Sequence, residues 1–558
     1  MSRSRKRFRG WSSKVVRAFM GPAFGPIAQR LEQGTHNPLV PGSNPGGPKE
    51  ILDLRFANAA LLRRALRGLR SVVSCVLFSA LILIPRCANY EDVFIDGKIY
   101  FVDADCYARM TRVRMVAEHP GLIVRQHDFE NFPAGTIPHT TAPFDYLIVV
   151  LSWALVALTA QPLDLAGAMV SPLLALAGGW FLWWWSRRLA GPGRYAALLL
   201  YALSGILVHG TALGRPDHQS LLIVALLVAL AAEWTLQENP SRRWSVVSGL
   251  SWGLALWVSL YEPLILLGGL VLCAATDRWS KLAAPPRRVG WFVCLGVVAL
   301  AALLERRWPE WPGAQPFFVS WSGTIGELKP VGLTTRTWFD WCGGLILLSP
   351  FLLAVARRRR TLPLTFAGLL VLTFLLTLWE ARWGYFLAVV FVLTLPVQIA
   401  VVRQKWLAWG ALAFVLLPLL QFWDGQFWPN DQMATRRAQD RIDAVQWRAA
   451  ASRLGDLLAR RSSRRGGFRL RSPTGRASQR LRAALTKVFP ASPRARVSLS
   501  PPRRKKRRRF CAGTKCSGFS SPRATAWPKI RLRSSGSPHQ RGRFVVCSTV
   551  PPQKRLHF

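Results

Sequence analysis

The stretch YFVDADCYARMTRVR, Tyr100 to Arg114, sets two carboxylates, Asp103 and Asp105, a short distance after an apolar run that ends near residue 86. This run, residues 68–86, has the length and the apolar character typical of a membrane-spanning helix. The two aspartates therefore lie in the polar loop that follows the first predicted crossing. Working outward from this stretch, the sequence predicts a polytopic α-helical membrane protein.

The hydrophobic composition supports a membrane protein, but it does not account for the high positive net charge. The chain has 558 residues, of which 51% are hydrophobic, together with 25 Trp and a net charge of +46. The charge is uneven, because no Asp or Glu follows Asp456. A nucleic-acid role would rest only on the basic run Arg503–Arg509 in that acid-free tail, so we expect no nucleic-acid partner.

The two ends of the chain differ from its middle. Residues 1–48 contain PIAQRLEQGTHNPLVPGSNPGGP, which resembles a translated bacterial tRNA gene, and we expect a mis-called start or a disordered leader there. Residues 459–558 are rich in Arg, Ser, Pro and Gly without hydrophobic periodicity, which predicts a disordered basic tail or the product of a frameshift.

Between the ends, apolar runs and basic clusters predict the topology. Clusters such as Arg187–Arg188, Arg242–Arg243 and Arg357–Arg360 belong on the cytoplasmic face by the positive-inside rule. The first helix leads outward, so only an odd number of crossings can separate the Asp105 loop from the cytoplasmic Arg187 loop. Two apolar runs, 144–160 and 165–185, lie between these loops, so one of them does not cross. We expect this to be 144–160, because Asp145 near its start suits a helix at the membrane surface. The twelve runs are 68–86, 144–160, 165–185, 195–212, 219–236, 245–261, 263–276, 289–304, 341–356, 361–379, 383–402 and 405–422.

With eleven crossings, the loops that hold Asp105, Asp217, Glu262, Glu327 and Arg382 all face outward, and two of the outer loops, 87–143 and 305–340, are long. Asp105, Asp217 and Glu327 come from three separate loops and would together form a hard oxygen site for Mg²⁺ or Mn²⁺. Simpler interpretations exist for each residue alone. Asp105 and Arg109 have the i,i+4 spacing of a surface ion pair, and Asp217 stands where a helix cap would.

Four motifs in chain order resemble the catalytic subunit of oligosaccharyltransferase, a family of membrane enzymes in the GT-C glycosyltransferase superfamily. The resemblance covers about residues 65–425. It implies a GT-C-type bundle of about 11–13 transmembrane helices with two long outer loops. The motifs are DCYARMTR (Asp105–Arg112), TALGRPDHQSLL (Thr211–Leu222), TIGE (Thr324–Glu327) and ARWGYFLAVV (Ala381–Val390).

The resemblance also implies roles for these residues. Asp105 would contact the acceptor amide and ligate a divalent metal, with Asp217 and Glu327 as further ligands. Glu327 would brace the acceptor as well, Asp103 would assist, and Arg382 would hold the phosphates of the lipid carrier. His218 is a candidate for contacting the lipid phosphate or the metal, or is an ordinary polar loop residue.

The chain departs from the family in two places. Gln219 stands where the second motif normally has another acidic residue, and Glu262 is a carboxylate on the same face that could compensate. The Trp-Trp-Asp-Tyr-Gly motif that reads the acceptor sequon in the family has no counterpart here. Residues 426–458 have the amphipathic pattern expected at the start of an extracytoplasmic domain.

These features predict a membrane glycosyltransferase at the outer face of a bacterial inner membrane. It would move a glycan from a polyprenyl-pyrophosphate carrier to a protein or lipid acceptor, in contact with membrane lipids. Alternatives are a single-sugar transferase that uses a polyprenyl-phosphate sugar, an inactive truncated membrane protein, and a transporter or flippase. A transporter would place its charges near the bilayer midplane, whereas the charges here belong to loops.

Overall fold

The computed structural model describes residues 68–464 except 70, 131–134, 139–141, 190, 278–281 and 307–324, and the side chains of 277 and 455–464 are also outside the description. Residues from Val72 onward form one compact unit, to which the following description applies. The expected leader 1–48 lies outside the described residues, as does the tail beyond Arg464. The last helix runs past the predicted boundary at 458 to Arg464.

Helices make up nearly all of the described structure, with one antiparallel pair of two-residue strands. Asp96 and Gly97 join these strands at φ values of 49° and 70°, which a tight type I′ hairpin turn requires. After the first helix, Ser71–Arg86, the elements are α2 (Tyr90–Val93), β1 (Phe94–Ile95), β2 (Lys98–Ile99), α3 (Ala104–Glu118), α4 (Ala142–Leu155), α5 (Pro162–Trp185), η2 (Ser186–Arg188), α6 (Gly191–Leu203), α7 (Gly205–His209), α8 (His218–Glu238), α9 (Arg242–Val258), α10 (Tyr261–Asp277), α12 (Pro285–Glu305), η4 (Gly326–Leu328), α14 (Thr337–Cys342), η5 (Gly344–Leu347), α15 (Ser349–Arg358), α16 (Leu364–Trp379), η6 (Ala381–Trp383), α17 (Gly384–Ala400), α18 (Lys405–Phe427) and α19 (Asp431–Arg464).

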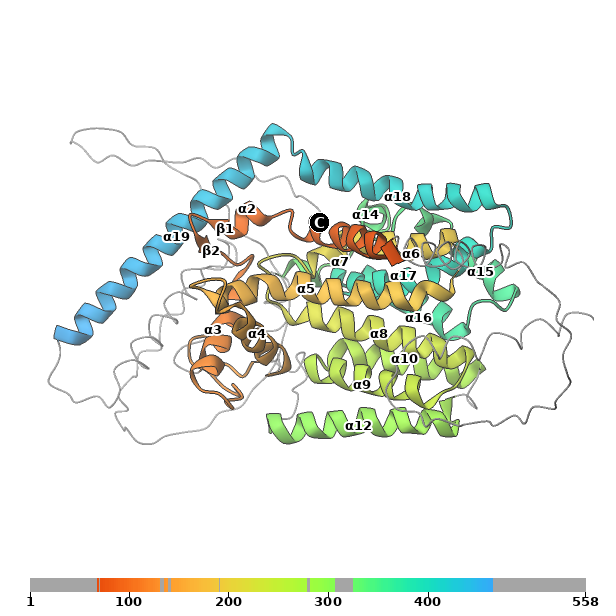
Figure 1. Cartoon of the computed structure of the whole chain (residues 1–558), viewed down its shortest axis with the longest axis horizontal. Coiled ribbons are helices and arrows are strands. Elements are labelled where there is room, and N and C mark those ends of the chain that lie inside the picture. Colours follow the sequence, from red (N-terminus) through yellow and green to blue (C-terminus); the bar gives the residue numbers. More distant parts are fainter. Residues whose placement is uncertain are drawn as a thin grey trace, which may run out of the picture. The chain divides into compact units, whose positions relative to one another are not determined.

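The lengths and composition of these helices are those of a multi-pass membrane protein. Figure 1 shows α5, α8, α9 and α12 running side by side, with α3 and α4 near one of their ends. Four shorter apolar helices accompany the long ones: Ser71–Arg86, Ala142–Leu155, Tyr261–Thr276 and Leu364–Trp379. Five segments in the described part of the chain are long and apolar enough to cross a bilayer, namely Pro162–Arg188, His218–Glu238, Pro285–Glu305, Ala381–Ala400 and Lys405–Phe427.

Two of these helices form the centre of the bundle and two lie at its edge. In α8 and α17, 89% of the most apolar window is buried, against 22% in α12 and 28% in α18. The exposed side chains of the edge helices are still large and apolar, as Phe292 and Trp406 illustrate. An apolar surface of this kind is stable in lipid but not in water, which supports the prediction of a membrane protein.

Two of the predicted crossings are broken helices. The run 195–212 forms α6 and α7, which are interrupted at Ser204, and the run 341–356 forms the end of α14, then η5 and most of α15. Gly343 stands at the second break with φ of 75°, and a Cβ there would lie 2.4 Å from the Val415 carbonyl oxygen. Close backbone contact with α18 therefore bends this segment, which a hydropathy pattern does not reveal.

The run 144–160, predicted to lie at the membrane surface, forms α4, which ends at Leu155. This helix packs against α3 and α5. Its position at the membrane surface stays a prediction.

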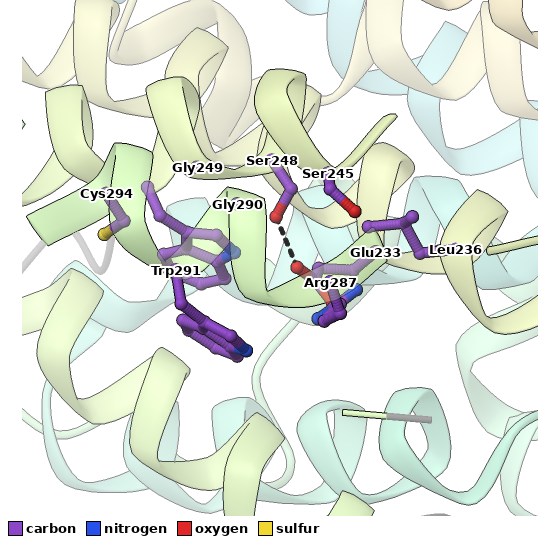
Figure 2. Close-up of a pocket in the computed structure, with 10 residues that line it drawn as sticks. Glu233, Leu236, Ser245, Ser248, Gly249, Arg287, Gly290, Trp291 and Cys294 are labelled. Atoms are coloured by element: carbon purple, nitrogen blue, oxygen red, sulfur yellow. Dashed lines mark hydrogen bonds and ion pairs between the residues drawn. The ribbon is translucent and has the colours of Figure 1, made fainter. Parts of the chain in front are cut away.

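Far from α3, a buried ion pair joins α8 to α12 (Figure 2). Arg287 donates to Glu233, and Ser248 donates to the other oxygen of the same carboxylate over 2.5 Å. A cavity of about 10 Å³ adjoins the pair. Beside it, α9 and α12 touch through backbone, because a Cβ at Gly249 would lie 2.2 Å from the Gly290 carbonyl oxygen. Glu233 and Arg287 are thus charged residues within helices, and both lie close to helix ends.

Candidate active site

The loop between α7 and α8, which carries the second acidic motif, is held by a buried arginine at the end of the first helix. The Arg86 side chain is fully buried and donates to Thr211 Oγ1 over 2.8 Å and to the carbonyl oxygens of Ala202 and Tyr201. Its own carbonyl oxygen accepts from the Leu213 amide over 2.8 Å. Guanidinium donors suit this position because they satisfy helix-end carbonyls that have no partner within the helix.

The same loop is bonded to the segment before α3. The Val102 amide donates to the Gly214 carbonyl oxygen over 3.0 Å. Gly214 has φ of 72°, which side chains other than glycine rarely adopt. This backbone bond brings the first two acidic motifs together, with Asp103 on one strand of the contact and Arg215 on the other. Arg215 Nη2 lies 3.9 Å from Asp103 Oδ2.

Asp103 and Asp105 occupy different positions at the start of α3. Asp103 is the N-cap, and its Oδ1 accepts from the Cys106 amide over 2.9 Å. Asp105 lies in the first turn and its residue is exposed. Desolvation of its carboxyl group and then the like charges of Asp103, Asp217 and Glu327 raise the pKa of Asp105, while Arg215 lowers it. Asp105 is thus surrounded by more negative than positive charge.

Arg215 joins the second motif to the third. It is buried, and its Nη2 donates to Glu327 Oε1 over 2.9 Å, while Nη1 lies 2.9 Å from His209 Nε2. Tyr385 Oη donates to the same Glu327 oxygen over 3.2 Å, and Gln219 Nε2 donates to the other over 3.3 Å. Both oxygens of Glu327 therefore have donors from the protein.

The contacts of His209 close this network into a ring. Because Arg215 has only donors, His209 Nε2 accepts, and Nδ1 carries the proton. Nδ1 lies 2.8 Å from Tyr385 Oη and donates to it. The tyrosine hydroxyl then donates to Glu327, so that the donors all lead to one carboxylate. Sequence reasoning missed His209, Arg215 and Tyr385, although Arg215 stands two residues before Asp217 in the motif already singled out.

Asp217 does not act as the helix cap that its position allowed. It occupies the N-cap position of α8, but its side chain makes no capping hydrogen bond. Its Oδ1 instead lies 2.6 Å from His218 Nδ1. Burial alone would raise the pKa of Asp217, but His218, Arg215 and Arg109 hold it well below the usual range of an aspartate.

The alternative that Arg109 forms a surface pair with Asp105 is wrong in its partner and its setting. Arg109 is buried, and its Nη1 lies 3.1 Å from Asp145 Oδ1 on α4. Its Nη2 lies 3.2 Å from His218 Nδ1. The Asp145 that suggested a polar end for α4 thus anchors α3 to α4 behind the acidic cluster.

Arg382 lies at the start of the segment that leads into α17, as the fourth motif predicted, and its partner is Glu262. Arg382 Nε lies 2.6 Å from Glu262 Oε1, and Ser259 donates to the other oxygen of this fully buried carboxylate. Both oxygens of Glu262 thus face partners of their own, and a role for Glu262 in place of Gln219 stays a prediction. The Ala381 amide donates to the Lys329 carbonyl oxygen over 2.8 Å, which ties the Glu327 loop to this segment.

The metal set Asp105, Asp217 and Glu327 stays a prediction. Among the described residues, no three His, Cys, Asp or Glu side chains have an arrangement that could hold a metal ion. Asp105 and Asp217 nevertheless share one electrostatic environment. Gln219 is buried, and its Oε1 makes no hydrogen bond. Carboxylate and amide oxygens are hard ligands that Mg²⁺ and Mn²⁺ accept, so Asp105, Asp217 and Gln219 have suitable donor atoms, whereas both oxygens of Glu327 already accept hydrogen bonds.

The fold has counterparts among solved structures, whereas no family model and no curated protein sequence matches the chain. The oligosaccharyltransferase AglB from Archaeoglobus fulgidus, in complex with an inhibitory peptide and a dolichol-phosphate, superposes with a TM-score of 0.51 at 14% identity over 78% of this chain and 62% of that one.

Two further structures of the A. fulgidus oligosaccharyltransferase are similar. The form tethered to an acceptor peptide containing the NVT sequon has a TM-score of 0.51 at 15% identity, and it covers 74% of this chain and 58% of that one. The complex with Zn and sulfate has a TM-score of 0.50 at 15% identity over 77% and 58%. The chain therefore has the fold of these enzymes and spans about three fifths of their length.

Proposed function

We propose that the chain is a membrane glycosyltransferase that moves a glycan from a polyprenyl-pyrophosphate carrier to an acceptor. The observation that supports this most directly is the cluster of Asp103, Asp105, Asp217 and Glu327, which comes from three separated motifs and meets on Arg215 in an oligosaccharyltransferase fold. The chemistry requires an acceptor made nucleophilic and a leaving phosphate whose charge is neutralised.

Asp105 is the proposed group that engages the acceptor. Asp105 is an exposed residue, and it is not the cap of its helix, since Asp103 has that role. An amide nitrogen is a poor nucleophile because its lone pair is delocalised. A carboxylate that accepts hydrogen bonds from this nitrogen would weaken the delocalisation and receive its proton as the bond to the sugar C1 forms. Glu327, held from both sides, is the proposed brace for the acceptor.

Arg382 and His218 are the proposed contacts for the carrier phosphates. The Arg382 side chain remains 27% exposed while its Nε faces Glu262, which leaves the guanidinium open to a phosphate oxygen. His218 Nδ1 faces Asp217, so a contact with phosphate falls to Nε2. Both residues lie beside carboxylates, and a pyrophosphate that approached them would be repelled without additional positive charge.

A divalent cation, Mg²⁺ or Mn²⁺, is part of the proposal for this reason. Asp105, Asp217 and the Gln219 side-chain oxygen are the residues that would hold it. When bound, the ion would supply positive charge to the leaving pyrophosphate. The structurally similar A. fulgidus enzyme forms a complex with Zn and sulfate, a divalent metal together with an anion, which supports this part of the proposal.

We further propose that the site faces outward from a bacterial inner membrane. The helix α8 begins with His218 at the acidic cluster, and α9 begins at Arg242 after α8 has ended. The basic residues Arg242 and Arg243 therefore lie at the opposite end of α8 from Asp217. By the positive-inside rule, the basic end is cytoplasmic and the acidic cluster is outside.

Transfer of a labelled glycan tests the proposal directly. The full chain in proteoliposomes receives a polyprenyl-pyrophosphate oligosaccharide, MnCl₂ and either an Asn-x-Thr peptide, its Gln-x-Thr control, or a lipid acceptor. The expected result is cation-dependent transfer that is lost in D105N. Absence of transfer to every acceptor by folded protein would overturn the proposal. A parallel reaction receives a polyprenyl-phosphate sugar as donor, and transfer only from that sugar, without added cation, would instead identify a single-sugar transferase.

A further inference from the structure

Arg215 has a setting unlike that of the other arginines near the site. Arg109 and Arg382 each face one carboxylate of their own, Asp145 and Glu262. Arg215 instead lies among the proposed functional carboxylates, 2.9 Å from Glu327 and 3.9 Å from Asp103. It is the guanidinium through which two of the acidic motifs are joined.

The protein holds Arg215 firmly in this position. His209 Nε2 accepts from its Nη1 over 2.9 Å, and its carbonyl oxygen accepts from Ser171 Oγ over 2.5 Å. The side chain is only 8% exposed. A positive charge in such a dry setting is poorly screened, so it acts strongly on any other cation that binds to the same carboxylates.

We propose that Arg215 is a resident counter-ion of the acidic cluster that occupies Glu327 and competes with a divalent cation for it. This inference rests on the cation in the proposed function. With Arg215 in place, Glu327 Oε1 accepts from a guanidinium, and a cation that used this oxygen would lie beside a fixed positive charge. The cation is then left with Asp105, Asp217 and the Gln219 oxygen, whereas displacement of Arg215 releases Glu327 as a fourth ligand.

The test measures the binding of Mn²⁺ alone to the purified full chain, by titration of the free-ion electron paramagnetic resonance signal. It compares variants of Arg215 and Glu327 and does not depend on catalysis. R215Q removes the charge and is expected to tighten Mn²⁺ binding by about tenfold or more, the usual effect of removing one neighbouring charge. R215K keeps the charge and is expected to stay within about threefold of the wild type. The double variant R215Q/E327Q is expected to lose most of the gain, because Glu327 is the released ligand.

A second variant keeps the inference testable if R215Q does not fold. H209A leaves Arg215 charged but removes one of its anchors, and we expect it to tighten Mn²⁺ binding by a smaller factor. Gel-filtration profile and thermal unfolding show which variants are folded. If R215Q, or H209A in its place, leaves the affinity unchanged or weakens it while D105N abolishes binding, competition is wrong and the cation site stands.

The remaining outcomes also decide. Binding of Mn²⁺ to R215Q but not to the wild type would support the competition in its strongest form. Absence of binding to wild type and R215Q alike would overturn this inference and the proposed cation together. Glycan transfer in the proteoliposome assay without added cation would then show that the transferase proposal stands independently of both.

Discussion

The two ends of α8 carry two ionic clusters of opposite design. Asp217 and Glu233 are sixteen residues apart, which places them about 24 Å apart along the helix. At the Glu233 end, one carboxylate meets one guanidinium and both are buried. At the Asp217 end, Arg215 lies among the carboxylates of Asp103, Asp105, Asp217 and Glu327, and Asp105 is exposed.

This difference indicates that the Glu233 pair holds helices together, whereas the cluster at Asp217 is suited to binding a ligand. A balanced, closed pair has no charge left over, and its energy is spent on joining α8 to α12. Within lipid, apolar contact alone gives neighbouring helices little reason to associate, so such polar contacts and close backbone approaches decide which helices pair. An unbalanced, open cluster costs the protein stability and retains charge for something that it binds.

The largest effect is expected at the balanced end. R287M leaves the Glu233 carboxylate buried without its cation, and such losses typically cost about 3–5 kcal/mol. The double variant E233Q/R287M removes both charges and is expected to recover most of that loss. Thermal and denaturant unfolding in detergent micelles measure the change. The exposed Arg288 gives the matched control, R288M, which is expected to have little effect. Equal losses in R287M and the double variant would contradict a balanced pair.

The next effect is expected at the open end and concerns activity rather than stability. D105N is expected to lower glycan transfer by about a hundredfold or more, the usual cost of removing a group that stabilises transition-state charge. Its unfolding midpoint should stay the same or rise, because one repelling charge is gone. D96N, in the exposed hairpin turn, is the control for a loss of charge at the same face. A destabilised D105N would mean that this carboxylate is structural.

The contact between α9 and α12 comes third. In G249A the new Cβ meets the Gly290 carbonyl oxygen at 2.2 Å, so the helices must separate. Overpacking of this kind costs about 1–3 kcal/mol, and we expect a lower unfolding midpoint with unchanged Mn²⁺ affinity. G296A on α12 meets nothing within 4 Å and serves as the control. Loss of Mn²⁺ binding in folded G249A would show that the two ends of α8 are coupled.

How much of this comparison the sequence predicts depends on the range of the contact. The motifs around Asp105, Asp217, Glu327 and Arg382 identify the segments that gather, because each has a local pattern beside a membrane-spanning run. The partners within the site are not local. Arg109 pairs with Asp145, 36 residues away, and Arg215 bonds Glu327 across 112 residues. Hydrophobic periodicity and cap patterns carry no information about such pairs.

The ion pair between Glu233 and Arg287 was not predicted, for a related reason. Glu233 and Arg287 stand near the ends of predicted crossings, where single charges are ordinary and indicate no partner. Only the crossing of α8, α9 and α12 shows that they meet, and this crossing depends on Gly249 and Gly290. The breaks at Ser204 and Gly343 escaped prediction in the same way, because they follow from packing between helices.

A pH profile tests whether the open cluster is coupled as its charges indicate. The pKa of Asp105 is raised in the folded protein, so as pH falls its carboxylate is protonated at a higher pH than that of an ordinary aspartate. Mn²⁺ binding should therefore weaken on the acidic side earlier than usual. D103N removes one repelling charge but keeps a capping side chain, and it should move this acidic limb to lower pH. A limb that stays in place or moves to higher pH would mean that Asp103 does not act on Asp105.

The smallest effect is expected where an ionic cluster is open to solvent, between Arg441 on α19 and two carboxylates of α2. Arg441 lies 2.7 Å from Glu91 and 3.4 Å from Asp92, but its side chain is 32% exposed. Exposed pairs contribute about 0–1 kcal/mol, so R441A should barely move the unfolding midpoint, and 1 M NaCl should erase the difference. R448A is the comparison on the same helix, because Arg448 donates to the Ile99 carbonyl oxygen and covers the Tyr100 ring. We expect R448A to cost more and to resist salt, since packing and a hydrogen bond are lost as well as charge. If R441A proved the more costly of the two, exposure to solvent would not explain how the ionic clusters differ. The balance of charge alone would then have to explain why the Glu233 end of α8 holds helices together and the Asp217 end binds a ligand.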